Sequence, residues 1–229
     1  MPFMPIHDDN ERTRIETPVV TWGAILVCAV VFMWQAGLPE VEEYHRLLAL
    51  GFVPGRLLGP LQLHPDLVIL PAPLSLVTTQ FLHGDFAHLL GNMAYLYIFG
   101  DNVEDAMGHL RFAVFFLLCG ILAALAHGLT EPSSAIPLIG ASGAISGILG
   151  AYLVLKPRAR ILVLLFVAPL RLPAWMLVAG WFAVQCFFGL STFGTDGPVA
   201  YWAHIGGFVA GIALLPLFRG VAPRRGGAG

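Results

Sequence analysis

Ser142 and His204 have the side-chain types that nucleophilic chemistry needs, within an otherwise apolar chain. Ser142 lies in the stretch PLIGASGAISGILGAY, and His204 lies in YWAHIGG. A serine hydroxyl is a poor nucleophile until a base such as a neutral imidazole accepts its proton. Because the apolar runs around both residues contain no carboxylate, we expect a Ser–His dyad without a third member.

A further polar set lies in the stretch HGDFAHLLGN, which contains His83, His88 and Asn92. His88 and Asn92 are four residues apart, so their side chains share one face of a helix. An imidazole N–H, a carboxamide NH2 and the backbone N–H of Ser142 are suitable donors to the oxyanion that forms when a serine attacks a carbonyl. The alternative is that Asn92 only links neighbouring helices.

Two other kinds of chemistry fit the sequence poorly. Eight histidines are present, but HExxH is absent, and the closest pair, His83 and His88, is five residues apart and does not align on one helical face. We therefore expect no metal and no cofactor. An aspartyl protease would need two facing carboxylates inside the apolar runs, and the sequence offers no such pair there.

Composition indicates that these residues belong to a membrane protein. The chain has 229 residues, of which 57% are hydrophobic and 11% are charged, too few charges for a soluble domain of this size. A net charge of −2 gives no support to nucleic-acid binding. Three cysteines fall in apolar runs and are expected to be buried thiols: Cys28, Cys119 and Cys186. The expected fold is an all-α polytopic membrane protein.

Six apolar runs are predicted to cross the bilayer as helices, each of which needs about 20 residues. They are residues 19–37, 87–103, 110–129, 142–155, 172–189 and 200–218. The fourth run is short, so its helix is expected to begin below the membrane surface. The space above it would be a water-filled vestibule that keeps Ser142 wet.

Small residues recur every four positions beside both Ser142 and His204. The two series are Gly143, Gly147 and Ala151 in the fourth run, and Ala203, Gly207 and Gly211 in the sixth. Such faces let two helix backbones approach closely. We therefore expect the fourth and sixth helices to touch, with the Ser142 hydroxyl within hydrogen-bond reach of the His204 ring.

Basic residues predict the orientation of the chain. Only Arg46 and Arg56 fall on the face opposite the termini, and the other ten lie on the face that the termini share: Arg12, Arg14, Arg111, Lys156, Arg158, Arg160, Arg171, Arg219, Arg224 and Arg225. The positive-inside rule then puts both termini in the cytosol, and we expect a bacterial inner membrane. The predicted parts are a tail at 1–18, a membrane domain at 19–218 with an external loop at 38–73, and a tail at 219–229. No cleavable signal peptide is expected.

Three further segments carry expectations of their own. Residues 161–169 are about half a span long and end in proline, so we expect an interfacial or buried connection. The external loop is apolar with Pro and Gly breaks, and we expect it to lie in the membrane interface. An acidic cluster at one helix end is expected to be solvated or to pair with Arg111: Asp101, Glu104 and Asp105.

The chain resembles the rhomboid family of intramembrane serine proteases from about residue 74 to residue 218. The resemblance rests on three motifs in the family's order and spacing: TTQFLHGDFAHLLGNMAYLYIFGDNVEDAMGHLRF, IGASGAISGILGAY and YWAHIGGFVAG. It implies a six-helix core that acts within the lipid bilayer and cleaves transmembrane segments of single-pass or multi-pass membrane proteins. By position, it also implies that Ser142 is the nucleophile and His204 the base.

The resemblance implies roles for the residues around this dyad as well. His88, Asn92 and the Ser142 amide are similar to the family's oxyanion site. Four residues would support the site: Gly140 in the loop that shapes it, His83 as a structural or water-organising residue, and Gly143 and Gly207 in the helix contact.

The sequence departs from the family in two places. Many relatives have Trp-Arg ahead of the second span, where this chain has Leu74 and Ser75, so the external loop is expected to pack differently. Some bacterial relatives have a tyrosine four residues after the nucleophile that stacks on the base, and this chain has Ser146 there. Other contacts must therefore orient His204.

Two other functions remain open on the sequence alone. A catalytically silent relative that binds and escorts membrane helices would share the fold, although such a protein would most simply have lost one of the catalytic-type residues. A small transporter could also use intramembrane His and Asn side chains. Against a transporter, the sequence has no inverted pair of broken helices and no intramembrane carboxylate.

Overall fold

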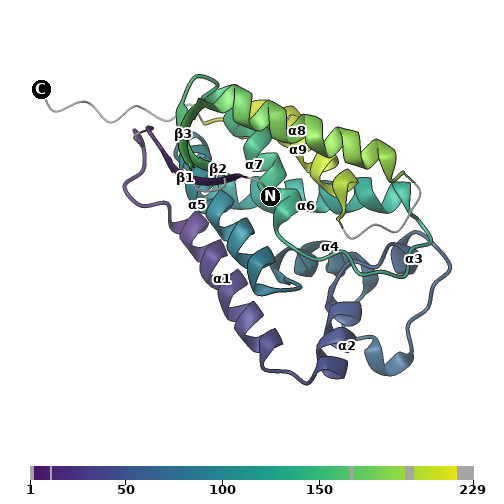
Figure 1. Ribbon diagram of the computed structural model, residues 1–229. Helices are drawn as coiled ribbons and strands as arrows, with labels where there is room; N and C mark the ends of the chain where they lie inside the picture. Colours follow the sequence, from purple (N-terminus) through teal and green to yellow (C-terminus); the bar gives the residue numbers. More distant parts are fainter. Residues whose placement is uncertain (1–2, 11, 166–167, 194–198, 221–229) are drawn as a thin grey trace, which may run out of the picture.

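The computed structural model describes residues 3–10, 12–165, 168–193 and 199–220, and six of its helices match the six predicted runs (Figure 1). They are α1 (Val19–Ala36), α5 (Phe86–Met107), α6 (His109–Thr130), α7 (Ser142–Leu155), α8 (Ala174–Ser191) and α9 (Tyr201–Phe218). By length and composition, α1, α6, α8 and α9 are each able to span a membrane, and the bent pair Pro65–Phe81 and Phe86–Met107 is a fifth candidate. The chain is thus an all-α polytopic membrane bundle, as predicted.

Helix α7 is the central helix of this bundle. All residues from Gly143 to Tyr152 are buried, and the helix contacts α5, α6, α8 and α9. Its start is set by Gly140, whose φ of +115° is accessible at low cost to glycine alone. Its end is set by Pro157, which lacks the N–H needed to continue a helix. Ser142 is therefore the first residue of α7, directly before its buried stretch.

Helices α7 and α9 meet along the predicted small-residue faces. A Cβ atom on Gly207 would overlap the carbonyl of Gly143, and one on Gly211 would overlap the carbonyl of Gly147. Further along, a Cβ atom on Gly150 would overlap the carbonyl of Phe208. The prediction that these two helices touch is confirmed, and the contact is one of backbone against backbone.

A three-stranded antiparallel sheet at one end of the bundle was not predicted (Figure 1). Its strands are β1 (Phe3–Asp8), β2 (Arg160–Leu165) and β3 (Ala168–Pro173), in the order β1-β2-β3. The predicted connection at residues 161–169 is therefore a hairpin. Ile161 and Val163 are buried, because alternate residues of β2 face the core. Leu172 and Pro173 belong to β3, so the fifth long helix begins later than expected.

The acidic cluster on α5 binds the N-terminal segment, and the expectation that it is solvated or pairs with Arg111 was wrong. Glu104 is fully buried and accepts hydrogen bonds from the backbone N–H groups of Val20 and Thr21, at 3.0 and 2.8 Å. Asp105 accepts from the backbone N–H groups of residues 13–15, and Asp101 pairs with Arg12 at 2.8 Å. Glu104 and Asp105 thus satisfy backbone N–H groups that a helix start and a loop leave free.

Two further contacts place the predicted cytosolic segments at the end of the molecule that carries the sheet. The Asp8 carboxylate of β1 accepts from the Tyr152 hydroxyl of α7, at 2.8 Å, and the Gly220 N–H donates to the carbonyl of Ala106 at 3.2 Å. The end of α5, the sheet and the chain after α9 therefore share one face. Arg224 and Arg225, which were predicted on that face, lie outside the described residues.

The predicted external loop folds into short helices at the opposite end of the bundle (Figure 1). They are α2 (Glu40–Leu50), α3 (Pro54–Leu57), η1 (Pro65–Leu67) and η2 (Ala72–Leu74), followed by α4 (Ser75–Thr78) and η3 (Thr79–Phe81). An antiparallel bridge between Phe52 and Leu138 ties this region to the segment that leads into α7.

Candidate active site

Ser142 and His204 form a direct hydrogen-bonded pair across the α7–α9 contact. The distance between Ser142 Oγ and His204 Nε2 is 2.9 Å. Ser142 is partly exposed at the start of α7, whereas the His204 side chain is buried. The close backbone approach of the two helices brings a hydroxyl and an imidazole together at the depth where α7 begins.

The second ring nitrogen of His204 has a partner on a third helix. Its Nδ1 lies 2.8 Å from Oε1 of Gln185, a buried residue of α8. Gln185 was not among the residues expected from the sequence. The sequence nevertheless contains an indication of it. Gln185 is an isolated carboxamide in the apolar run AWMLVAGWFAVQCFFGLS, and a polar side chain inside a membrane span is costly and therefore indicates a functional role.

Ser146, four residues after Ser142, has no ring that could stack on His204. Its Oγ donates to the carbonyl of Ser142 at 2.6 Å, which is a bond within its own helix. The aromatic ring described next to His204 instead belongs to Trp181 of α8, with ring centroids 6.0 Å apart and planes tilted by 39°.

Gly140, His88 and Asn92 lie together beside the start of α7. A Cβ atom on Gly140 would stand 2.9 Å from the His88 ring and 3.6 Å from Asn92 Nδ2. His88 and Asn92 come from the first two turns of α5, which is capped by the Asp85 carboxylate accepting from the His88 N–H at 2.7 Å. Among the described residues, the buried Asn92 NH2 has no hydrogen-bond partner and is available as a donor.

His83 lies behind His88, away from direct contact with the dyad. The two rings meet edge to face with centroids 5.2 Å apart, and His83 is fully buried. Its backbone is fixed by Gln35 of α1, whose carboxamide donates to the His83 carbonyl at 3.1 Å and accepts from its N–H at 3.2 Å. His83 thus supports the wall on which His88 packs.

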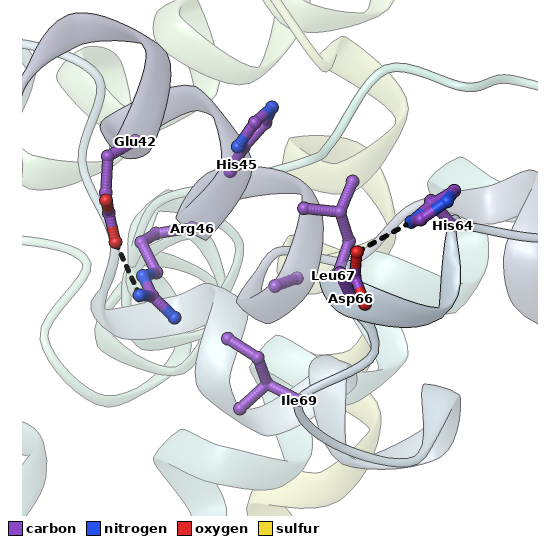
Figure 2. A pocket seen from close by; sticks show the side chains of 8 residues that line it. Glu42, His45, Arg46, His64, Asp66, Leu67 and Ile69 are labelled. Atoms are coloured by element: carbon purple, nitrogen blue, oxygen red, sulfur yellow. Dashed lines mark hydrogen bonds and ion pairs between the residues drawn. The ribbon is translucent and has the colours of Figure 1, made fainter.

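A separate hollow lies in the predicted external loop and does not include the dyad (Figure 2). Its volume is about 340 Å³, and its lining includes Glu42, His45 and Arg46 of α2 with His64 and Asp66 at η1. Four of the polar side chains there form two pairs: Arg46 with Glu42 at 2.5 Å, and His64 with Asp66 at 3.3 Å. In the part of the chain that the structure describes, no group of three or more His, Cys, Asp or Glu is arranged to hold a metal ion.

Several known proteins are similar in sequence to this chain. Rhomboid protein 1, mitochondrial, from Saccharomyces cerevisiae is 33% identical over 147 residues, which is 61% of this chain and 40% of the yeast protein. From Bacillus subtilis, Putative rhomboid protease YdcA is 37% identical over 78 residues (34% of this chain, 39% of YdcA), and Rhomboid protease GluP is 32% identical over 141 residues (61% and 25%). The chain thus spans less than half the length of these relatives.

The family model of the Rhomboid domain matches residues 72–220, which is more than half of the chain. The matched region contains all the residues described above around Ser142 and His204, except Gln35 of α1. This chain is therefore a member of the rhomboid family.

Proposed function

We propose that the protein is an intramembrane serine endopeptidase in which Ser142 is the nucleophile and His204 the general base. The observation that carries the proposal is the 2.9 Å contact between Ser142 Oγ and His204 Nε2 beside a buried carboxamide donor with no described partner. Family membership and the two relatives named as proteases support the same reaction.

In the proposed reaction, Ser142 Oγ attacks a peptide carbonyl of the substrate while His204 Nε2 accepts the hydroxyl proton. The oxyanion is stabilised by Asn92, by His88 and by the backbone N–H of Ser142. His204 then gives its proton to the leaving amine, which leaves an acyl-enzyme ester on Ser142. Water, deprotonated by His204, hydrolyses this ester and regenerates the hydroxyl.

The proposed substrates are transmembrane segments of other membrane proteins. A peptide bond inside a helix is shielded, and its carbonyl is already hydrogen-bonded, so the segment must unwind before attack. Segments with Gly, Pro or polar residues near their external end unwind at lower cost and should be preferred. The proposed location is a bacterial inner membrane. Both termini are proposed to lie in the cytosol, and the distribution of Lys and Arg supports this orientation.

The proposal is tested with the full chain reconstituted in liposomes with a single-span reporter that carries a Gly-rich break. Wild-type protein should release the reporter fragment, and Ser142→Ala should abolish cleavage while the melting temperature stays close to that of the wild type. Cleavage by Ser142→Ala at the wild-type rate would refute the assignment. Absence of cleavage by a wild-type protein that still binds the reporter would favour the silent helix-binding alternative.

A further inference from the structure

We infer that Gln185 of α8 is a positioning residue that fixes the tautomer and the orientation of His204. The inference rests on the proposed function, because a fixed tautomer matters to catalysis only if His204 acts as the base. In this role Gln185 replaces the tyrosine that stacks on the base in some relatives, four residues after the nucleophile. In this chain that position is Ser146, whose hydroxyl is bonded to its own helix.

The Gln185 carboxamide turns its oxygen towards His204. Its NH2 group faces the carbonyl of Trp181 at 3.5 Å, and its Oε1 faces His204 Nδ1 at 2.8 Å. A carbonyl oxygen accepts and cannot donate, so His204 Nδ1 must carry the hydrogen. In the neutral ring, Nε2 then has a free lone pair, and it lies 2.9 Å from Ser142 Oγ. This is the tautomer that a general base requires.

Contacts on both sides of the pair hold α8 against α9. Towards the cytosolic end, Phe182 of α8 stacks on Phe208 of α9 with ring centroids 4.2 Å apart. Towards the external end, Trp202 Nε1 of α9 donates to the carbonyl of Gly189 of α8 at 3.1 Å. Gln185 lies between these contacts and is 5% exposed, so water does not compete for the bond. The carboxamide is therefore preorganised and does not pay the cost of ordering at each turnover.

Gln185 is the group that orients the His204 ring through Nδ1. The titratable side chains that act on the ring electrostatically are His88 of α5 and His127 of α6. Within the described residues, the hydrogen-bond partner of Nδ1 is Gln185, and no carboxylate occupies the place of the third member of a triad. A neutral acceptor orients the ring without the charge that an Asp would add.

Two variants separate positioning from packing. Gln185→Met fills nearly the same volume but removes the acceptor, so kcat should fall roughly 10- to 100-fold, with KM little changed. Gln185→Glu keeps an acceptor at Nδ1 and should recover most of kcat. Because its carboxylate would stabilise an imidazolium, the acidic limb of the kcat/KM profile should move to higher pH. The matched control is Val184→Ala, on the neighbouring, lipid-exposed position of α8, which should leave kcat unchanged.

The measurements are reporter cleavage in liposomes, a pH–rate profile and the melting temperature of each variant. Equal kcat for wild type and Gln185→Met would overturn the inference, as would an unmoved pH profile in Gln185→Glu. If both variants lose kcat only in proportion to a loss of folded protein, Gln185 is structural and the inference is also overturned. Failure of the proposed function itself would look different, because the wild-type protein would then not cleave the reporter at all.

Discussion

Gly207 of α9 lies so close to Gly143 of α7 that a Cβ atom on Gly207 would overlap the Gly143 carbonyl. The obstacle is backbone and cannot move aside as a side chain would, so Gly207→Ala must push the two helices apart. We expect a loss of about 1–3 kcal/mol in the free energy of unfolding and a strong fall in reporter cleavage. Thermal unfolding and cleavage kinetics in the same detergent measure both effects.

The matched control for Gly207 is Gly180→Ala on α8, where an added Cβ atom meets nothing within 4 Å. Because alanine is favoured over glycine in a helix by about 1 kcal/mol, this variant should be neutral or slightly stabilised. Equal stability and activity of the two variants would show that α7 and α9 do not meet backbone against backbone at Gly207.

Asn92→Ala should lower kcat by about 10²- to 10³-fold, because it removes a donor to the proposed oxyanion. The buried NH2 of Asn92 has no described partner to lose, so the melting temperature should change little. Gly91→Ala is the control, since a Cβ atom there also has nothing within 4 Å. Cleavage of the reporter by Asn92→Ala at the wild-type rate would show that Asn92 does not stabilise the oxyanion.

Glu104→Gln should destabilise the protein without a direct effect on chemistry. The fully buried carboxylate caps the first turn of α1 through Val20 and Thr21, and charge-assisted bonds of this kind contribute roughly 1.5–3 kcal/mol. Glu42→Gln, which breaks an exposed ion pair with Arg46, should cost under about 1 kcal/mol. The two unfolding free energies give the comparison, and equal losses would mean that Glu104 is not the cap of α1.

The proposed orientation predicts which positions an impermeant thiol reagent reaches in intact cells. In a background without native cysteines, His64→Cys in the external hollow should be labelled from outside, because the His64 side chain is 71% exposed. Asp9→Cys, which follows β1 on the predicted cytosolic face, should be labelled only after the cells are opened. The reverse pattern would invert the orientation.

The six helices of the apolar runs could be predicted because each is encoded locally. Apolar runs bounded by Gly, Pro and charged residues gave α7 its bounds at Ser142 and Leu155, and four-residue glycine spacing indicated the α7–α9 contact. The sheet could not be predicted, because β1 pairs with β2 more than 150 residues further along the chain, and neither strand is distinctive alone. The buried position of Glu104 depends in the same way on a distant partner, the start of α1.

The candidate site was predictable where the chemistry demands particular residue types. A serine and a histidine beside glycine faces indicated a dyad, and four-residue spacing grouped His88 with Asn92. Gln185 could not be assigned in this way, because its partner depends on how α8 is rotated and shifted against α9. That register is set by packing between Phe182 and Phe208, which no local pattern encodes.

The most direct test is whether a fluorophosphonate probe forms a covalent adduct with the reconstituted protein and where that adduct lies. A Ser142 nucleophile with a His204 base predicts one modified residue, Ser142, identified by mass spectrometry of the digested protein, with labelling lost in Ser142→Ala and strongly slowed in His204→Ala. An unlabelled wild-type protein of demonstrated fold, or an adduct on any other residue, would contradict it.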